Sequence, residues 1–337
     1  MYQQSGNHAV QMTNKDNMVY IIGAGAIGKA LAVMLKHNGR DVVLVRGSVD
    51  DGRIANDEIT LELAGGKKYV QTITVLTLSA IKRFEGTVVL TSKSFGNDKL
   101  AAKLGKRNNQ FPIVLLQNGL GIEAPFLHQG YHALYRGVLF ATSQASKDTV
   151  SFRQVSASPV GVVKGSVAAL NAIVASISTP EFTFSPTAAI EKAVWQKTII
   201  NTVFNSVCPL LDIDNGIFHR DEYALVLARN IISACVKVAN SAGIAVNAHE
   251  IEEGLLQISK VADGQLISTL QDIRAGRPTE IETLNFEIDK IAQSMQMQEL
   301  TKEILLLGKL IKIKSATQQR RRAPHVRSIA KGKMLNK

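Results

Sequence analysis

Three polar side chains share one face of a predicted helix in the second half of the chain. Lys197, Asn201 and Asn205 lie four residues apart in WQKTIINTVFN, so a helix places them in one row. The neighbouring residues are apolar almost all round, which is typical of a buried helix. Burying a lysine and two amides is costly unless partners satisfy them, so we interpret the row as the wall of a ligand cleft. A structural hydrogen-bond network, or a lysine that reaches solvent, would explain the same spacing.

A lysine in a cleft has a definite chemistry. Its ammonium can stabilise negative charge that develops on an oxygen atom, and it can donate a proton to that atom. Asparagine amides both donate and accept hydrogen bonds, so they can hold the carboxylate or hydroxyl groups of a substrate. The row therefore predicts a ligand cleft.

A glycine-rich turn near the start of the chain predicts a second site. GAGAIG at residues 23–28 follows the apolar, β-rich run 19–22 and opens a helical pattern. The first glycine permits the tight bend, the second lets a pyrophosphate approach the backbone, and the third lets the helix pack on the sheet. The helix N-terminus supplies N–H donors for phosphates. The predicted dinucleotide site comprises Gly23, Ala24, Gly25, Ala26, Ile27 and Gly28. A tight turn without a ligand is the alternative.

The residue that ends the second predicted strand bears on the choice of cofactor. An Asp or Glu there would bind the ribose 2′-hydroxyl of NAD, whereas this chain has Arg46, followed by Gly47 and Ser48. A guanidinium suits the 2′-phosphate of NADP, which an acid would repel. We therefore expect NADP(H) rather than NAD. A solvated loop arginine is the alternative.

Two further segments carry polar residues near predicted element ends. Thr279 precedes Glu280 and Glu282 in a capping-box pattern, with Thr279 as N-cap and Glu282 at N3. Glu280 then lies in the first helical turn, and sequence alone favours reading it as a helix-start charge. QNGLG at 117–121 follows the predicted strand 113–116, and loops at the carboxyl ends of parallel strands are where α/β sheets bind ligands.

The elements that must position these residues change in type along the chain. Apolar strands alternating with helical segments indicate a parallel sheet covered on both faces, whereas helical patterns dominate after Pro186. The predicted strands are 19–22, 41–45, 88–90, 113–116 and 137–141. The predicted helices of the second half are 187–209, 217–243, 248–262, 279–297 and 300–313. We expect an α/β chain with an N-terminal Rossmann-type parallel-sheet domain followed by an all-helical C-terminal domain.

These patterns divide the chain into four parts. Met18 directly precedes the first strand, so translation from Met1 and translation from Met18 both fit the pattern. The tail is basic and poor in apolar residues, which is typical of disorder. The expected parts are a disordered extension at 1–17, an NADP-binding Rossmann domain at 18–185, a helical substrate and catalytic domain at 186–314, and a disordered tail at 315–337.

The net charge of +11 comes almost entirely from the last 29 residues. The 337 residues include 39 Lys and Arg against 28 Asp and Glu, and ten of the basic residues lie in the last 29 positions, which contain no acid. The other 29 basic and 28 acidic residues leave a body at +1. A nearly neutral body without a nucleic-acid-binding motif disfavours nucleic acid as a partner.

Composition excludes several other classes of protein. The chain is 45% hydrophobic, unlike disordered proteins, and it has no apolar run of the roughly 18 residues that span a bilayer. Two cysteines and seven scattered histidines predict neither a disulfide framework nor a metal site. The polar N-terminus lacks the apolar core of a signal peptide. We expect a cytoplasmic protein, monomeric or homodimeric, with no membrane partner.

Four motifs together resemble the ketopantoate reductase family (2-dehydropantoate 2-reductases). The resemblance runs from about Met18 to Ile313. Its motifs read GAGAIG at 23–28, QNGLG at 117–121, WQKTIINTVFN at 195–205 and STLQDIRAGRPTEI at 268–281. The last two are specific to the family rather than to Rossmann folds in general. The segment from Ser206 to Pro209, the N-terminal extension and the arginine-rich tail depart from the family pattern.

The resemblance implies a role for each candidate residue. It makes Lys197 the catalytic lysine and Glu280 a glutamate that contacts both cofactor and substrate. Asn118 would lie near the nicotinamide and the substrate. A Glu280 carboxylate close to Lys197 would help to keep that ammonium protonated. The residues implied in substrate binding are Asn201, Asn205, Asn215 and Ser268.

The implied reaction is the NADPH-dependent reduction of 2-dehydropantoate to (R)-pantoate, a step that feeds pantothenate and coenzyme A synthesis. Hydride would reach the C2 ketone while Lys197 donates the proton. Two alternatives stay open. One is a reductase of the same build that acts on another 2-oxo acid. The other is a non-catalytic NADPH-binding sensor whose basic tail contacts nucleic acid, which the row containing Lys197 disfavours.

Overall fold

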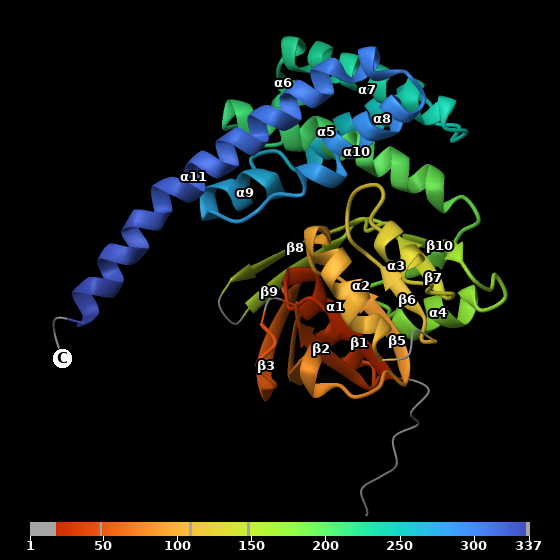
Figure 1. The fold of residues 1–337 in the computed structure, drawn as a ribbon, viewed down its shortest axis with the longest axis vertical. Coiled ribbons are helices and arrows are strands. Elements are labelled where there is room, and N and C mark those ends of the chain that lie inside the picture. Colours follow the sequence, from red (N-terminus) through yellow and green to blue (C-terminus); the bar gives the residue numbers. More distant parts are fainter. Residues whose placement is uncertain (1–17, 48, 108–109, 147–148, 335–337) are drawn as a thin grey trace, which may run out of the picture. The chain divides into compact units, whose positions relative to one another are not determined.

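The computed structural model describes residues 18–47, 49–107, 110–146 and 149–334, with side chains described as far as Arg322. The expected extension at 1–17 and the last three residues of the tail lie outside this part. The chain forms two compact units (Figure 1), here called the sheet unit and the helical unit. The sheet unit comprises Met1–Ser92, Asp98–Gln117 and Pro125–Ala188, and the helical unit comprises Lys93–Asn97, Asn118–Ala124 and Ala189–Lys337.

The sheet unit is built on an 11-stranded sheet in the order β11-β10-β7-β6-β5-β1-β2-β4-β3-β9-β8. Its strands are β1 (Met18–Ile22), β2 (Val42–Arg46), β3 (Ile54–Leu63), β4 (Lys68–Thr77), β5 (Gly86–Leu90), β6 (Ile113–Leu115), β7 (Leu134–Gly137), β8 (Ala141–Ser146), β9 (Thr149–Gln154), β10 (Ser158–Lys164) and β11 (Phe184–Pro186). Its helices are α1 (Ala26–His37), η2 (Leu78–Ala80), α2 (Asn97–Gly105), α3 (Ala124–His128) and α4 (Leu170–Ile177). Helix α1 buries Leu31, Met34 and Leu35 in the core that it forms with the sheet.

The centre of the sheet is parallel, as the sequence predicts. Strand β1 pairs in parallel with β2 on one side and with β5 on the other, and β5, β6 and β7 continue the parallel order. The carboxyl ends of these strands therefore lie at one edge of the sheet, where α/β folds bind ligands. The N–H of Gly23 donates to the carbonyl of Val45 at 2.9 Å, which joins the turn after β1 to the end of β2.

The outer strands differ from the expectation of an all-parallel sheet. Strands β3 and β4 form an antiparallel hairpin, and the β8–β9 and β7–β10 pairs are also antiparallel. In the hairpin Ile59 and Leu61 alternate with less buried residues, as do Ile73 and Val75. Such alternation is the signature of a strand with one solvated face, so this part of the sheet was detectable from the sequence.

The predicted strand at 137–141 is wrong. The stretch is apolar and partly buried, but it connects β7 to β8 rather than pairing along its length. The N–H of Val138 donates to the carbonyl of Pro159, and the N–H of Phe140 donates to the hydroxyl of Ser158. The apolar side chains of this stretch are partly buried, but its backbone does not form the continuous hydrogen bonds of a β-strand.

The helical unit surrounds one long helix, α5. Its elements are η3 (Ser94–Gly96), α5 (Ile190–Leu211), α6 (Ile217–Arg220), α7 (Glu222–Ser241), α8 (Ala248–Val261), α9 (Ser268–Ala275), η4 (Ile281–Thr283), α10 (Asn285–Ser294), η5 (Gln298–Thr301) and α11 (Lys302–Met334). On α5, Trp195, Ile199 and Val203 are buried in the core of this unit. Helix α5 packs against α7, α8, α9 and α11. Because so many helices cover it, polar side chains on α5 can be buried deeply.

Helix α7 has the length and hydropathy of a membrane-spanning helix, and among the described helices it alone does. Its residues Ile231, Ile232 and Cys235 are buried in the core of the helical unit. Burial among other helices is the ordinary setting of an apolar helix in a globular core.

Two features of the helical unit contradict the predicted boundaries. Helix α9, which the sequence analysis missed, ends at Gly276 with φ +69°, a left-handed C-cap that glycine adopts without strain. The helix predicted at 279–297 is wrong at its start, because η4 precedes it and α10 begins only at Asn285.

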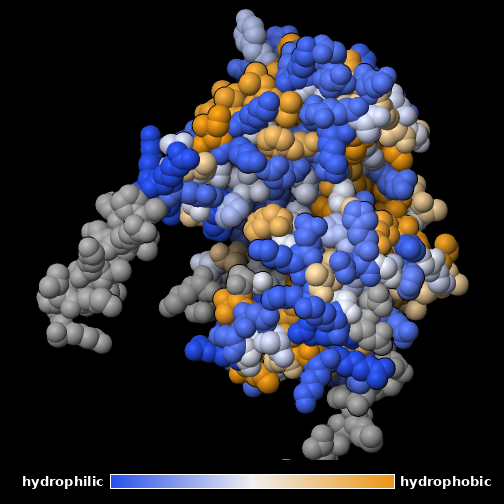
Figure 2. Space-filling view, viewed as in Figure 1, coloured by the Kyte–Doolittle hydropathy of each residue, from blue (hydrophilic) through white to orange (hydrophobic). Residues whose placement is uncertain are grey.

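Helix α11 continues past the boundary expected at 315, and the expected disorder of the tail stays a prediction. Ile311 and Ser315 are buried one turn apart, and the ammonium of Lys314 donates to the carbonyl of Pro209 at the end of α5. This face keeps the first half of α11 on the helical unit. The exposed side of α11 carries Arg320 to Arg322, and Figure 2 shows hydrophilic residues over much of the visible surface of this unit.

Candidate functional site

The glycine-rich turn of the sheet unit has the geometry of a dinucleotide-binding turn. Gly23 has φ +129°, and a Cβ there would lie 2.4 Å from the backbone nitrogen of Ser92. A Cβ on Gly28 would lie 1.9 Å from the carbonyl oxygen of Gly23. A Cβ on Gly25 would meet nothing within 4 Å. The outer glycines are therefore needed for packing, whereas the middle one leaves open space beside the N-terminus of α1, as a bound pyrophosphate requires.

The other residues of the turn connect it to the core. Ala24, Ala26 and Ile27 are partly buried against the core of the sheet unit. The hydroxyl of Thr91 donates to the carbonyl of Gly23 at 2.9 Å. Thr91 follows β5, so the neighbouring strand holds the turn in place, and the sequence analysis did not identify this residue.

Arg46 ends β2 as predicted, but an acid lies beside it. Its guanidinium is 3.7 Å from the carboxylate of Asp57, and the two side chains are 35% and 44% exposed. The acid comes from β3, which pairs with β4, which in turn pairs with β2. Spacing along the chain could not reveal this neighbour. A half-exposed ion pair of this kind is weak, so Arg46 can exchange it for a phosphate.

The predicted row on α5 is present and buried. Asn201 is 9% exposed and Asn205 is 4% exposed. The amide nitrogen of Asn205 donates to the backbone carbonyl of Asn201 at 2.9 Å, while its amide oxygen is buried without a partner among the described residues. A buried acceptor without a donor is costly, so this oxygen is suited to a ligand's hydroxyl group.

Lys197 begins the row, and its surroundings alter its acidity. The residue is partly exposed, yet burial of the ammonium lowers the pKa of Lys197 below its usual value. A lysine with a lowered pKa is a better proton donor near neutral pH.

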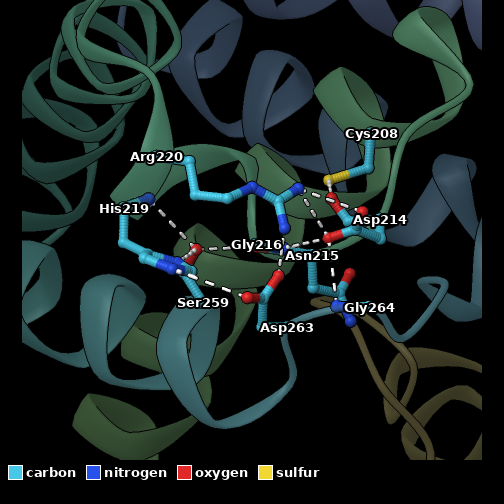
Figure 3. A network of polar contacts seen from close by, with 9 residues as sticks. All are labelled: Cys208, Asp214, Asn215, Gly216, His219, Arg220, Ser259, Asp263 and Gly264. Carbon is cyan, nitrogen blue, oxygen red and sulfur yellow. Dashed lines mark hydrogen bonds and ion pairs between the residues drawn. The ribbon is translucent and has the colours of Figure 1, made fainter.

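Asn215 lies in the connection between α5 and α6 (Figure 3) and is 6% exposed. Its N–H donates to the carbonyl of Gln265 at 2.9 Å, and its amide oxygen is buried without a partner in the described part of the chain. Ser268 is exposed at the first residue of α9, three positions after Gln265. The backbone bond therefore links the segments that carry the two predicted substrate residues.

Glu280 is not part of a capping box, so that prediction is wrong. Glu280 itself precedes η4, and the N-terminus of η4 has no side-chain cap. The carboxylate of Glu280 is 10% exposed and lies 2.9 Å from the ammonium of Lys93. Glu280 pairs with Lys93, and the expectation that its carboxylate helps to keep Lys197 protonated stays a prediction.

Lys93 is a second residue, after Thr91, that the sequence did not single out. Its ammonium lies between two acids, 2.9 Å from Glu280 and 3.2 Å from Asp272. Burial lowers the pKa of Lys93, but attraction to both carboxylates outweighs burial and leaves that pKa above its usual value. Arg277 also bonds Asp272, at 2.8 Å. The signal in the sequence was a lysine three residues after the end of β5.

Asn118 belongs to the QNGLG loop, which packs on η4. The N–H of Leu120 donates to the carbonyl of Thr283 at 2.8 Å. Gly119 has φ +98°, and a Cβ there would lie 2.3 Å from the hydroxyl of Thr283. The glycines of this loop therefore serve close packing, and they place Asn118 next to the segment that carries Glu280.

The candidate residues thus fall into two groups. The sheet unit holds residues 23–28 and Arg46, and the helical unit holds all the others. The helical group comprises Asn118, Lys197, Asn201, Asn205, Asn215, Ser268 and Glu280, with Lys93 added by the structure.

Comparisons with known proteins identify relatives of both units. A family model described as "Ketopantoate reductase PanE/ApbA" matches residues 19–161. A second, "Ketopantoate reductase PanE/ApbA C terminal", matches residues 189–314. Among curated proteins, the chain is 25% identical over 301 residues to the 2-dehydropantoate 2-reductase of Pyrococcus horikoshii, covering 88% of this chain and 97% of that one.

Solved structures share the fold. A dimeric ketopantoate reductase from Staphylococcus aureus is similar with a TM-score of 0.73 and 19% identity, covering 89% of this chain and 99% of that one. A D-mandelate dehydrogenase in complex with NADH and anilino(oxo)acetate is similar with a TM-score of 0.76 and 18% identity, over the same shares of the two chains.

Proposed function

This chain belongs to the ketopantoate reductase family, and we propose that it is an NADP-dependent oxidoreductase that reduces 2-dehydropantoate to (R)-pantoate. The observation that carries the proposal is the buried row on α5, where Lys197 stands beside Asn201 and Asn205. The reaction needs an acid at the ketone and polar groups that hold the rest of the substrate, and this row supplies both. The product would enter pantothenate and coenzyme A synthesis in the cytoplasm.

The sheet unit would hold the cofactor. NADPH, when bound, supplies the hydride that reaches C2 of the substrate. The turn Gly23-Ala24-Gly25-Ala26-Ile27-Gly28 fits a dinucleotide, because Gly25 leaves open space and the first turn of α1 contains no acid. Arg46 would bind the 2′-phosphate and release Asp57.

Lys197 would act as the general acid. Its ammonium would donate a hydrogen bond to the ketone oxygen and stabilise the negative charge that develops there. As C2 gains the hydride, the proton would pass from the ammonium to that oxygen, and the neutral amine would regain a proton from solvent. The lowered pKa of Lys197 favours this transfer.

The amides and a hydroxyl would orient the substrate. The unpartnered amide oxygens of Asn205 and Asn215 can accept hydrogen bonds from a substrate hydroxyl. Asn201 and the exposed hydroxyl of Ser268 can donate to its carboxylate. Holding the substrate at several points turns binding energy into orientation of the ketone.

Glu280 and Asn118 would complete the site from the loops of the helical unit, contacting both cofactor and substrate. The ammonium of Lys93 lies 2.9 Å from the Glu280 carboxylate, whose oxygens can accept hydrogen bonds. We place Glu280 with Lys197 among the catalytic residues. The enzyme would act as a monomer or homodimer on a small 2-oxo acid.

A second candidate is a reductase of another 2-oxo acid. The likeness to a D-mandelate dehydrogenase with bound NADH and anilino(oxo)acetate favours testing it. The test is NADPH oxidation by the full chain with 2-dehydropantoate, alongside phenyl and branched 2-oxo acids, with NADH measured in parallel. We expect the highest kcat/KM for 2-dehydropantoate with NADPH. A higher kcat/KM for another 2-oxo acid would favour the second candidate.

A further inference from the structure

A cluster of polar residues surrounds the segment that carries Asn215 (Figure 3). Asp214 and Gly216 flank Asn215 in the connection between α5 and α6. The cluster adds Arg220 from α6 and Ser259 from α8. Apart from Asn215, none of these residues contacts the substrate in the function proposed above, so the cluster requires its own explanation.

The carboxylate of Asp214 joins two connections of the helical unit. It accepts hydrogen bonds from the N–H groups of Gly216 at 2.7 Å and of Gly264 at 3.2 Å. Arg220 binds both of its oxygens, at 2.9 and 3.0 Å, and the same guanidinium pairs with Asp263. Gly264 lies in the connection between α8 and α9, so one carboxylate ties the segment of Asn215 to the segment that leads to Ser268.

Ser259 fixes the backbone of Asn215 itself. Its hydroxyl, fully buried on α8, donates to the carbonyl oxygen of Asn215 at 2.7 Å. The hydroxyl oxygen of Ser259 accepts a hydrogen bond from the N–H of His219 at 3.2 Å and lies 3.1 Å from Nδ1 of that histidine. The other ring nitrogen of His219 lies 3.8 Å from Asp263. Asn215 is thus held at its carbonyl by Ser259 and at its N–H by Gln265.

The order of Ser259, His219 and Asp263 resembles a hydrolytic triad, but its geometry does not. The serine hydroxyl is inaccessible, and its proton is engaged by the carbonyl of Asn215. A nucleophile must be reachable by the substrate. The geometry therefore favours a positioning role.

We propose that Ser259, together with Arg220 and Asp214, positions the amide of Asn215 and the connection leading to Ser268 for substrate binding. The inference rests on the function proposed above. Asn215 is nine-tenths buried and its amide oxygen is unpartnered among the described residues, so a small shift of its backbone misdirects the acceptor. Ser259 then affects the KM for the substrate and leaves the binding of NADPH unchanged.

The test compares Ser259→Ala, Asn215→Ala and the double variant in the full chain. Ser259→Ala is expected to raise the KM for 2-dehydropantoate about five- to tenfold, the worth of one hydrogen bond, with an unchanged Kd for NADPH. Because Ser259 acts through Asn215, it is expected to change KM little further in the Asn215→Ala background. Thr301→Val is the matched control, since it removes a buried hydroxyl that bonds Asp289 instead, and its KM is expected to stay that of the wild type.

An unchanged KM in Ser259→Ala, or fully additive effects of the two substitutions, would overturn the inference. If Ser259→Ala does not fold, Asp263→Asn replaces it, because Asp263 is 44% exposed. Its expected effect is a smaller rise in KM, about two- to threefold, again absent in the Asn215→Ala background, and an unchanged KM would overturn the inference. Absence of wild-type turnover overturns the proposed function and this inference together, whereas normal turnover with an unchanged KM overturns the inference alone.

Discussion

The ammonium of Lys93 lies 2.9 Å from the carboxylate of Glu280, a residue 187 positions later in the chain. Lys93 also lies 3.2 Å from Asp272, and both carboxylates are at most 10% exposed. Lys93 thus bridges two buried acids, of which Asp272 also pairs with Arg277.

Replacing Lys93 by Met should leave these acids without their shared cation. We expect the free energy of unfolding to fall by about 1–2 kcal/mol, a modest figure because Lys93 is itself 39% exposed and solvent screens the pair. Lys93→Arg keeps the charge and should lose less. Urea denaturation of the three proteins measures the difference, and equal midpoints would contradict this account of the pairing.

The glycine turn offers a matched pair of substitutions. Gly28→Ala places a Cβ 1.9 Å from the carbonyl of Gly23, so we expect a loss of about 1–3 kcal/mol of stability. Gly25→Ala meets nothing within 4 Å, so stability should be unchanged while the new methyl group occupies the space proposed for the pyrophosphate. Thermal denaturation and NADPH titration separate the two effects. Tight NADPH binding by Gly25→Ala would argue against a cofactor at this turn.

Arg46 and Asp57 test the choice between NADPH and NADH. Arg46→Ala should raise the KM for NADPH about tenfold and change the KM for NADH little, because the guanidinium would bind only the 2′-phosphate. Asp57→Asn should lower the KM for NADPH about twofold by removing a competing carboxylate. Steady-state kinetics with both cofactors measures this. Equal changes in the KM for NADPH and the KM for NADH would show that Arg46 does not bind the 2′-phosphate.

We expect the protonation of Asp214 at acid pH to lower the stability of the folded protein. Its hydrogen bonds from Arg220 lower the pKa of Asp214 to about 2 from an ordinary 3.8. A carboxyl with a lowered pKa stabilises the folded state fully above its unfolded pKa, and this contribution disappears as pH falls through the folded value. The loss should therefore occur between about pH 4 and pH 2.

Asp214→Asn should flatten the curve of melting temperature against pH in that window. Asp50 has a similarly lowered pKa, so the difference between variant and wild type isolates Asp214. Identical slopes for the two proteins would show that Asp214 does not titrate as described.

The local patterns of the sequence were sufficient for the centre of the fold and for the row on α5. GAGAIG lies between a strand and a helix, and the spacing of Lys197, Asn201 and Asn205 repeats the turn of one helix, so both follow from neighbouring residues. The prediction of a capping box at Thr279 was wrong because the chain forms the short helix η4 there. Glu280 pairs instead with Lys93, which is far away in the sequence.

The remaining features depend on contacts between residues far apart in the chain. The neighbour of Arg46 comes from the pairing of β2, β4 and β3, and the partner of Glu280 comes from the loop after β5. The periodicity of apolar residues along the chain does not predict ion pairs between residues that are far apart in the sequence. Helix α11 passes the predicted boundary at 315 because Ile311 and Ser315 keep one face buried, a pattern that the high charge of the tail obscured.

The turnover of Lys197→Ala tests the central claim most directly. With saturating NADPH and 2-dehydropantoate, we predict that kcat falls by about 10²- to 10⁴-fold, the usual contribution of a general acid, while the Kd for NADPH stays within about twofold of the wild type, because the cofactor turn lies in the other unit. A kcat close to that of the wild type would contradict the assignment of Lys197 as the proton donor.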